Sequence, residues 1–130
     1  MKEEMIGKDL SGCEKLIMKI VWDAKEDIST PEIIEALRIR YGKDYARTTV
    51  VTFVQRLMEK GFVTTYRKGR VSYVHAIRDE DQYKENFLKH IEDFWFCGQP
   101  SSLLSALCRK SKPSQKEIMR MRKLIDELDD

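Results

Sequence analysis

Side chains that can recognise DNA bases occur at helical spacing between Ala46 and Glu59. Arginine can donate two hydrogen bonds to guanine, glutamine can form a bidentate pair with adenine, and the methyl groups of threonine and valine can contact thymine. The candidate base- or backbone-contacting residues are Arg47, Thr48, Thr49, Val51, Thr52 and Gln55. The same pattern fits the polar side of an ordinary amphipathic helix, so the helix alone leaves both interpretations open.

Positive charge is concentrated around this segment. The whole chain of 130 residues has a formal net charge of +2, yet residues 38–70 hold nine basic and two acidic residues, a net of +7. Phosphate is the natural counterpart of such a block. Lys68 and Arg70, which flank Gly69, are therefore expected to contact phosphate or the minor groove of DNA.

A helix, a glycine stop and a β-hairpin are predicted to position these side chains. The inward stripe of the helix consists of Val50, Val54, Leu57 and Met58. Gly61 stands where a C-terminal cap is expected. Two β-rich runs, Phe62–Arg67 and Val71–Ala76, then flank a short basic turn with a glycine, which is a hairpin signal.

Capping-box patterns, a serine followed three residues later by a glutamate, mark the starts of several helices. They occur at Ser11–Glu14, Ser29–Glu32 and Ser114–Glu117. The first two predict helices over about 12–24 and 30–40, ahead of the helix described above. Three helices followed by a two-stranded hairpin form a winged helix-turn-helix arrangement, which we expect over residues 1–78.

Residues 79–130 are predicted to form a helical dimerisation region. Three helices are expected there, the second capped by Ser101 or Ser102, and their apolar stripes have no obvious partner within the chain. A DNA reader of this size usually binds two half-sites of a palindromic operator, which favours a homodimer over folding back onto residues 1–78. The candidate dimerisation residues are Tyr83, Phe87, Ile91, Phe94, Trp95, Leu103, Leu104, Leu107, Ile118, Met121, Ile125 and Leu128.

Other classes of protein find little support in the sequence. Cys13, Cys97 and Cys108 are widely spaced and odd in number, which predicts free thiols and neither a disulfide framework nor a metal site. No nucleophile–base motif or phosphate-binding glycine loop is present, so we expect no enzyme activity and no cofactor. No signal peptide or transmembrane segment is recognisable, which predicts a cytoplasmic protein without membrane insertion.

Several short motifs resemble the BlaI/MecI/CopY penicillinase-repressor family. The most specific is the run Thr49-Val50-x-Thr52 followed by Arg56-Leu57-x-x-Lys60-Gly61. Weaker matches are Glu14 with Ile20-Val21-Trp22, the stretch Phe96–Ser101, and Lys116-Glu117-Ile118. The resemblance covers nearly the whole chain. It implies a mainly α fold with a small β-hairpin, in which a winged helix-turn-helix domain precedes a helical dimerisation extension, and it implies a homodimeric repressor of transcription.

The resemblance also bears on how repression would be relieved. In β-lactam-responsive members a membrane sensor-transducer triggers cleavage between Asn and Phe by a protease; the equivalent positions here are Ala106 and Leu107, which differ from that pair. The CxC…CxC hook of copper-responsive members is absent from the sequence. The inducing signal therefore stays open, as does the rival hypothesis of a winged-helix protein-interaction module that binds no DNA.

Overall fold

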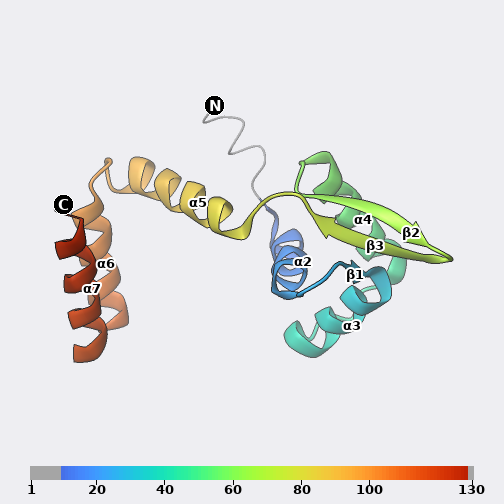
Figure 1. The fold of residues 1–130 in the computed structure, drawn as a ribbon, viewed down its shortest axis with the longest axis horizontal. Helices are drawn as coiled ribbons and strands as arrows, with labels where there is room; N and C mark the ends of the chain where they lie inside the picture. The colour runs from blue at the N-terminus through green and yellow to red at the C-terminus, as the bar shows by residue number, and fades with distance from the viewer. Residues whose placement is uncertain (1–9, 129–130) are drawn as a thin grey trace. The chain divides into compact units, whose positions relative to one another are not determined.

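The computed structural model describes residues 10–128, and the chain divides into two compact units, the first ending at Glu85 and the second beginning at Asn86. The described elements, in order, are α2 (Gly12–Asp23), β1 (Ile28–Ser29), α3 (Thr30–Tyr41), α4 (Arg47–Glu59), β2 (Val63–Lys68), β3 (Val71–Ala76), α5 (Glu80–Trp95), α6 (Pro100–Ser111) and α7 (Gln115–Glu127). Figure 1 shows these elements along the chain. Six helices and one small antiparallel sheet confirm the predicted mainly α fold class.

The sheet of the first unit has three strands in the order β1-β3-β2. Strands β2 and β3 form the predicted hairpin, with Val63 opposite Ala76 and Lys68 opposite Val71. The sheet also has a third strand that the sequence did not predict, because β1 pairs with β3 through Ile28 and Ser29. A strand of two residues is too short for alternation to reveal it.

The core of the first unit is built where its helices meet the sheet. The residues of this core are Leu10, Ile17, Met18, Ile20, Val21, Ile33, Leu37, Val50, Val54, Leu57, Phe62, Val63 and Val74. Met58, which the helical stripe predicted to face inward, is 40% exposed. It lies at the edge of the stripe, where a flexible side chain can remain in solvent.

Helix ends follow the predicted signals in the first unit and depart from them in the second. Complete capping boxes form at Ser11–Glu14 and Ser29–Glu32. At Ser114 only the serine accepts a hydrogen bond, so that box is incomplete. The prediction of a serine cap for α6 was wrong: Gln99 is the N-cap, and Pro100 occupies the first turn, where its missing N–H costs nothing.

The second unit has no buried side chain among its described residues, 86–128. Its helices are amphipathic, yet their apolar residues are half-buried or exposed. Helices α6 and α7 lie side by side (Figure 1). Within residues 10–128, no helix is long and apolar enough to span a bilayer.

Candidate nucleic-acid interface

Helix α4 separates the core from a polar outer face. Val50, Val54 and Leu57 are buried on its inner side. The structure brings the candidate contact residues of this helix together on the other side. Arg47, Thr48, Val51, Thr52 and Gln55 are exposed there, and Thr49 is half-buried beside them. The face holds both hydrogen-bonding groups and methyl groups, which is the chemistry that base edges in the major groove require.

Both ends of α4 are fastened to other parts of the first unit. Before its start, the Tyr45 ring packs edge-on against Phe53 at 5.8 Å between centroids, and the Tyr45 hydroxyl lies 3.0 Å from Cys13 Sγ on α2. At its end, Gly61 adopts φ +81°, a left-handed conformation suited to glycine, and its N–H donates to the Met58 carbonyl. These contacts fix the direction in which α4 presents its outer face.

An ion pair between α2 and the end of α4 joins a buried carboxylate to a partly exposed amine. Lys60 Nζ donates to Glu14 Oε1 at 2.6 Å, and the Glu14 side chain is 2% exposed. Burial alone would raise the pKa of Glu14, but hydrogen bonds from Lys60 and Ser11 outweigh it and hold that pKa below its ordinary value. Glu14 therefore caps α2 and also anchors α4, a second role that its capping pattern did not predict.

Hydrogen bonding within α4 limits what some of the outer side chains can do. The Thr52 hydroxyl donates to the Thr48 carbonyl at 2.9 Å, so its oxygen and methyl group are left to face a partner. Arg56 lies over the Phe53 ring at 5.8 Å. By contrast, the side chains of Arg47 and Gln55 make no hydrogen bond or ion pair with another described residue. Their donors are available to a ligand.

Ion pairs divide the basic residues of the 38–70 block into two groups. Arg38 pairs with Glu35, Arg40 with Asp23 and Lys60 with Glu14. The other six make no ion pair with any carboxylate of the described chain; they are Lys43, Arg47, Arg56, Arg67, Lys68 and Arg70. The uncompensated positive charge therefore gathers on α4, on the segment before it, and on the β2–β3 hairpin.

The hairpin presents its cations at a tight turn. Gly69 adopts φ +64° between Lys68 and Arg70, a conformation that glycine reaches without strain. Lys68 Nζ lies 5.6 Å from the centre of the Tyr73 ring. Tyr73 in turn stacks on Tyr66 at 5.7 Å. Both predicted phosphate-contacting residues, Lys68 and Arg70, are exposed at this tip.

One residue that belongs to this region was not singled out from the sequence. Asp27 precedes β1 and accepts a hydrogen bond from the Tyr66 hydroxyl at 2.7 Å, while its other oxygen lies 2.8 Å from His75 Nδ1. The sequence separations are 39 and 48 residues. No local pattern could have revealed these contacts, because charge and spacing near Asp27 indicate only a polar turn.

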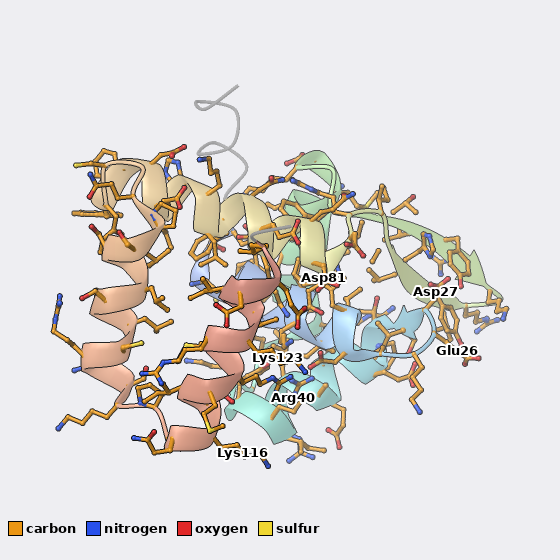
Figure 2. All side chains as sticks on the ribbon, turned by 60° about the vertical axis from the view of Figure 1, so that its left-hand side comes forward. Glu26, Asp27, Arg40, Asp81, Lys116 and Lys123 are labelled. Carbon is orange, nitrogen blue, oxygen red and sulfur yellow. The ribbon has the colours of Figure 1, made fainter. Side chains whose placement is uncertain are left out.

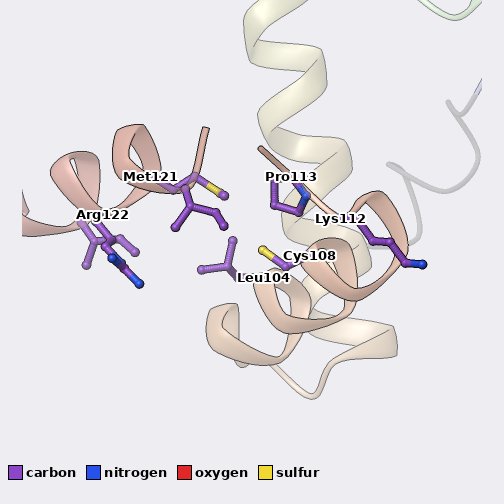
Figure 3. Close-up of a pocket in the computed structure, with 8 residues that line it drawn as sticks. Leu104, Cys108, Lys112, Pro113, Met121 and Arg122 are labelled. Carbon is purple, nitrogen blue, oxygen red and sulfur yellow. The ribbon is translucent and has the colours of Figure 1, made fainter. Parts of the chain in front are cut away.

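The candidate dimerisation residues fall into two places. Eleven of them lie in the second unit, and Leu104, Ile118, Met121 and Ile125 line one apolar groove between α6 and α7 together with Cys108 (Figure 3). Tyr83 lies in the first unit, where its ring is 5.5 Å from both Trp22 and Phe62. Its part in dimerisation stays a prediction. The cleavage-site equivalents Ala106 and Leu107 lie inside α6.

The residues 10–128 hold no group of three or more histidine, cysteine, aspartate or glutamate side chains arranged for a metal ion.

Known proteins match both the sequence and the fold. The model of the penicillinase repressor family matches residues 10–127. The methicillin resistance regulatory protein MecI of Staphylococcus aureus (strain N315) is 26% identical over 118 residues, which span 91% of this chain and 94% of MecI. The solution structure of the DNA-binding domain of the repressor BlaI has a TM-score of 0.50 and 29% identity, covering 58% of this chain and 89% of that one. The crystal structure of MepR, a transcription regulator of the Staphylococcus aureus multidrug efflux pump MepA, shares the fold at a TM-score of 0.50 and 14% identity, covering 97% of this chain and 87% of MepR.

Proposed function

The chain belongs to the penicillinase repressor family and is a transcriptional repressor, not an enzyme, and from this premise we propose that it binds a dyad-symmetric DNA operator as a cytoplasmic homodimer. In each protomer α4 enters the major groove, and the β2–β3 hairpin, the wing, contacts the backbone. The observation that carries the proposal is the outer face of α4, where exposed base-reading side chains stand on a helix whose opposite side is buried.

The charge pattern supports this orientation. The six basic residues of the 38–70 block that make no ion pair with the described residues include Arg47 on α4 and Lys68 and Arg70 on the wing. Lys and Arg contacts to phosphate supply most of the affinity of a DNA-binding protein and set its register, while contacts to bases supply the specificity. The proposed roles of α4 and the wing follow that division.

The second unit supports the homodimer. None of its described side chains is buried, and the large apolar side chains of Phe94 and Trp95 are 67% and 71% exposed. Exposed apolar groups on this scale mark interaction sites. A second copy of the chain would cover the α5 stripe and the groove between α6 and α7, and it would place two α4 helices on two half-sites.

The controlled genes and the partners are proposed from similarity alone. The name of the relative MecI supports a role in β-lactam resistance or a related stress response. A membrane sensor-transducer or a protease is the partner that would relieve repression. Because Ala106 and Leu107 lie inside α6, any cleavage there requires local unwinding of that helix.

Footprinting on the promoter of the chain's own gene, at two salt concentrations, tests the proposal. We expect protection of a site with dyad symmetry that fades at higher salt, because phosphate contacts release counterions. Sedimentation analysis of the same sample should give twice the mass of 15.4 kDa. Absence of protection at both salts would overturn DNA binding and leave the protein-interaction hypothesis.

A further inference from the structure

Asp27 connects the segment before β1 to both strands of the wing. Its Oδ2 accepts the Tyr66 hydroxyl proton at 2.7 Å, and its Oδ1 lies 2.8 Å from His75 Nδ1. Tyr66 belongs to β2 and His75 to β3, so one carboxylate joins three segments of the first unit. Figure 2 shows Asp27 and its neighbour Glu26 beside the hairpin.

The contacts continue from Asp27 toward the tip of the wing. Tyr66 and Tyr73 are directly opposite each other across the two strands, and their rings stack at 5.7 Å with an interplanar angle of 13°. Lys68 Nζ then lies 5.6 Å from the Tyr73 ring centre. A continuous series of side chains thus joins Asp27 to a cation that the proposed function assigns to phosphate.

The wing needs such support. The only strand beside β3 other than β2 is β1, and it reaches no farther than Tyr73. Beyond that residue no third strand pairs with them (Figure 1), and the Thr30 hydroxyl donates to the Ser72 carbonyl at 3.4 Å. An isolated two-stranded hairpin is at best marginally stable in water. Side-chain contacts along its length therefore decide how well its tip is held.

The charge of Asp27 has the wrong sign for a direct part in DNA binding. Hydrogen bonds with His75 and with Tyr66 hold the pKa of Asp27 below its ordinary value, so the carboxylate stays ionised. A negative charge near the wing repels phosphate. Its presence beside the cationic hairpin fits a role in holding the hairpin.

We infer that Asp27 is a positioning residue for DNA binding, which holds the wing through Tyr66 and His75 so that Lys68 meets the phosphate backbone. This inference rests on the proposed function. It makes a prediction opposite in sign to simple electrostatics: removing this negative charge weakens binding to DNA.

Three variants of the full chain separate position from charge. The hydrogen bonds that join Asp27 to Tyr66 and His75 form a brace between the segment before β1 and the hairpin. Asp27→Ala removes this brace and one negative charge. Tyr66→Phe removes one hydrogen bond and no charge while keeping the stacked ring. Glu26→Ala is the matched control, because Glu26 is exposed and makes no hydrogen bond or ion pair with another described residue. Binding is measured by fluorescence anisotropy on a duplex from the chain's own promoter and on a random-sequence duplex, at several salt concentrations.

We expect Asp27→Ala to bind both duplexes about tenfold more weakly and Tyr66→Phe about fivefold more weakly, since a hydrogen bond to a charged group is lost. Glu26→Ala should bind as well as the unaltered chain or up to about twofold more tightly. The dependence of log affinity on log salt should become shallower by about 0.9 for Asp27→Ala, the equivalent of one phosphate contact. A merely structural role would lower thermal stability and leave that slope unchanged.

Equal or tighter binding by Asp27→Ala, with the slope unchanged, overturns the inference. If the unaltered chain binds neither duplex, the proposed function fails, and amide hydrogen exchange still tests the brace. Faster exchange in Asp27→Ala confined to residues 66–73, with α4 unaffected, would then support the brace. Unchanged exchange in that segment would refute it.

Discussion

The two units of this chain use the same helical pattern in opposite ways. The first unit buries thirteen apolar residues, all of them between Leu10 and Val74. The second buries none among residues 86–128, yet it holds nine of the fifteen large hydrophobic residues that are exposed. Amphipathic helices form in both units, because periodicity specifies which face is apolar and not what covers it. The difference supports the proposal that the first unit is stable alone, whereas the second is stabilised by a second copy of the chain.

A charge introduced on the apolar face of the second unit should have the largest effect. Trp95→Asp would bury an unpaired carboxylate in the proposed dimer and should weaken association about a thousandfold, or about 4 kcal/mol. Ile39→Asp is the matched control, since Ile39 is 67% exposed and Trp95 is 71% exposed. Sedimentation equilibrium measures the dimer dissociation constant of both variants. Dissociation of the Ile39→Asp protein, or a stable dimer of Trp95→Asp, would contradict the contrast between the units.

The same substitution placed in each unit should produce two different responses. Leu57 is fully buried and Leu107 is 54% exposed. Leu57→Ala should lower the free energy of unfolding of the first unit by about 3 kcal/mol, in a transition that does not depend on protein concentration. Leu107→Ala should lower a separate transition whose midpoint rises with concentration, as mass action requires for a dimer. Calorimetry at two concentrations distinguishes them; a single shared transition would count against independent units.

The fold of the first unit was largely predictable because its signals are local. Two capping boxes, the Gly61 stop and the basic turn at Gly69 lie within a few residues of the elements that they delimit. The exceptions have physical reasons. Strand β1 is two residues long, and in the second unit the start of α6 depends on Pro100 in place of the serines that follow it.

The candidate interface was predictable only in part. The outer residues of α4 share one face because helical spacing requires it, and the cations of the wing follow from its turn. Asp27 and the Lys60–Glu14 pair join residues that are far apart in the sequence. Their roles appear only when the chain is folded. In the proposed dimer the apolar faces of the second unit are likewise covered by residues that no local pattern identifies, because they belong to a second copy of the chain.

Removal of the Glu14 charge should disturb the first unit alone. Glu14→Gln leaves Lys60 facing a neutral amide; Lys60 is partly exposed, so we expect a loss of about 2 kcal/mol. The folded-state pKa of Glu14 lies below its ordinary value of 4.5, so its contribution is fully present above that pH and is lost as the pH falls through the lower value. Urea unfolding between pH 3 and pH 7, values chosen to bracket this range, should show a weaker acid dependence in the variant. If the stability of both proteins fell equally with pH, Glu14 would not be the cause of the acid dependence.

Within the first unit, replacing a base-contacting residue should change the sequence preference of DNA binding, whereas replacing a phosphate-contacting residue should weaken binding to all sequences. Gln55→Ala should relax the preference at a single base pair by about 1.5 kcal/mol, because glutamine can form a bidentate pair with adenine. Affinity for other positions should change little. Competition among operator duplexes altered one base pair at a time measures this. Uniform weakening across all duplexes would place Gln55 on the backbone.

Arg70→Ala should have the smallest and least selective effect. Arg70 is exposed at the tip of the wing and makes no ion pair with the described residues, so it can bind phosphate without losing an internal partner. The variant should bind all duplexes about fivefold more weakly. The slope of log affinity against log salt should become shallower by the equivalent of about one phosphate contact. Arg38→Ala removes the same charge but from a residue that Glu35 already neutralises through two hydrogen bonds of 3.0 and 2.8 Å. Equal loss in both variants would mean that net charge, and not the position of the wing, determines affinity.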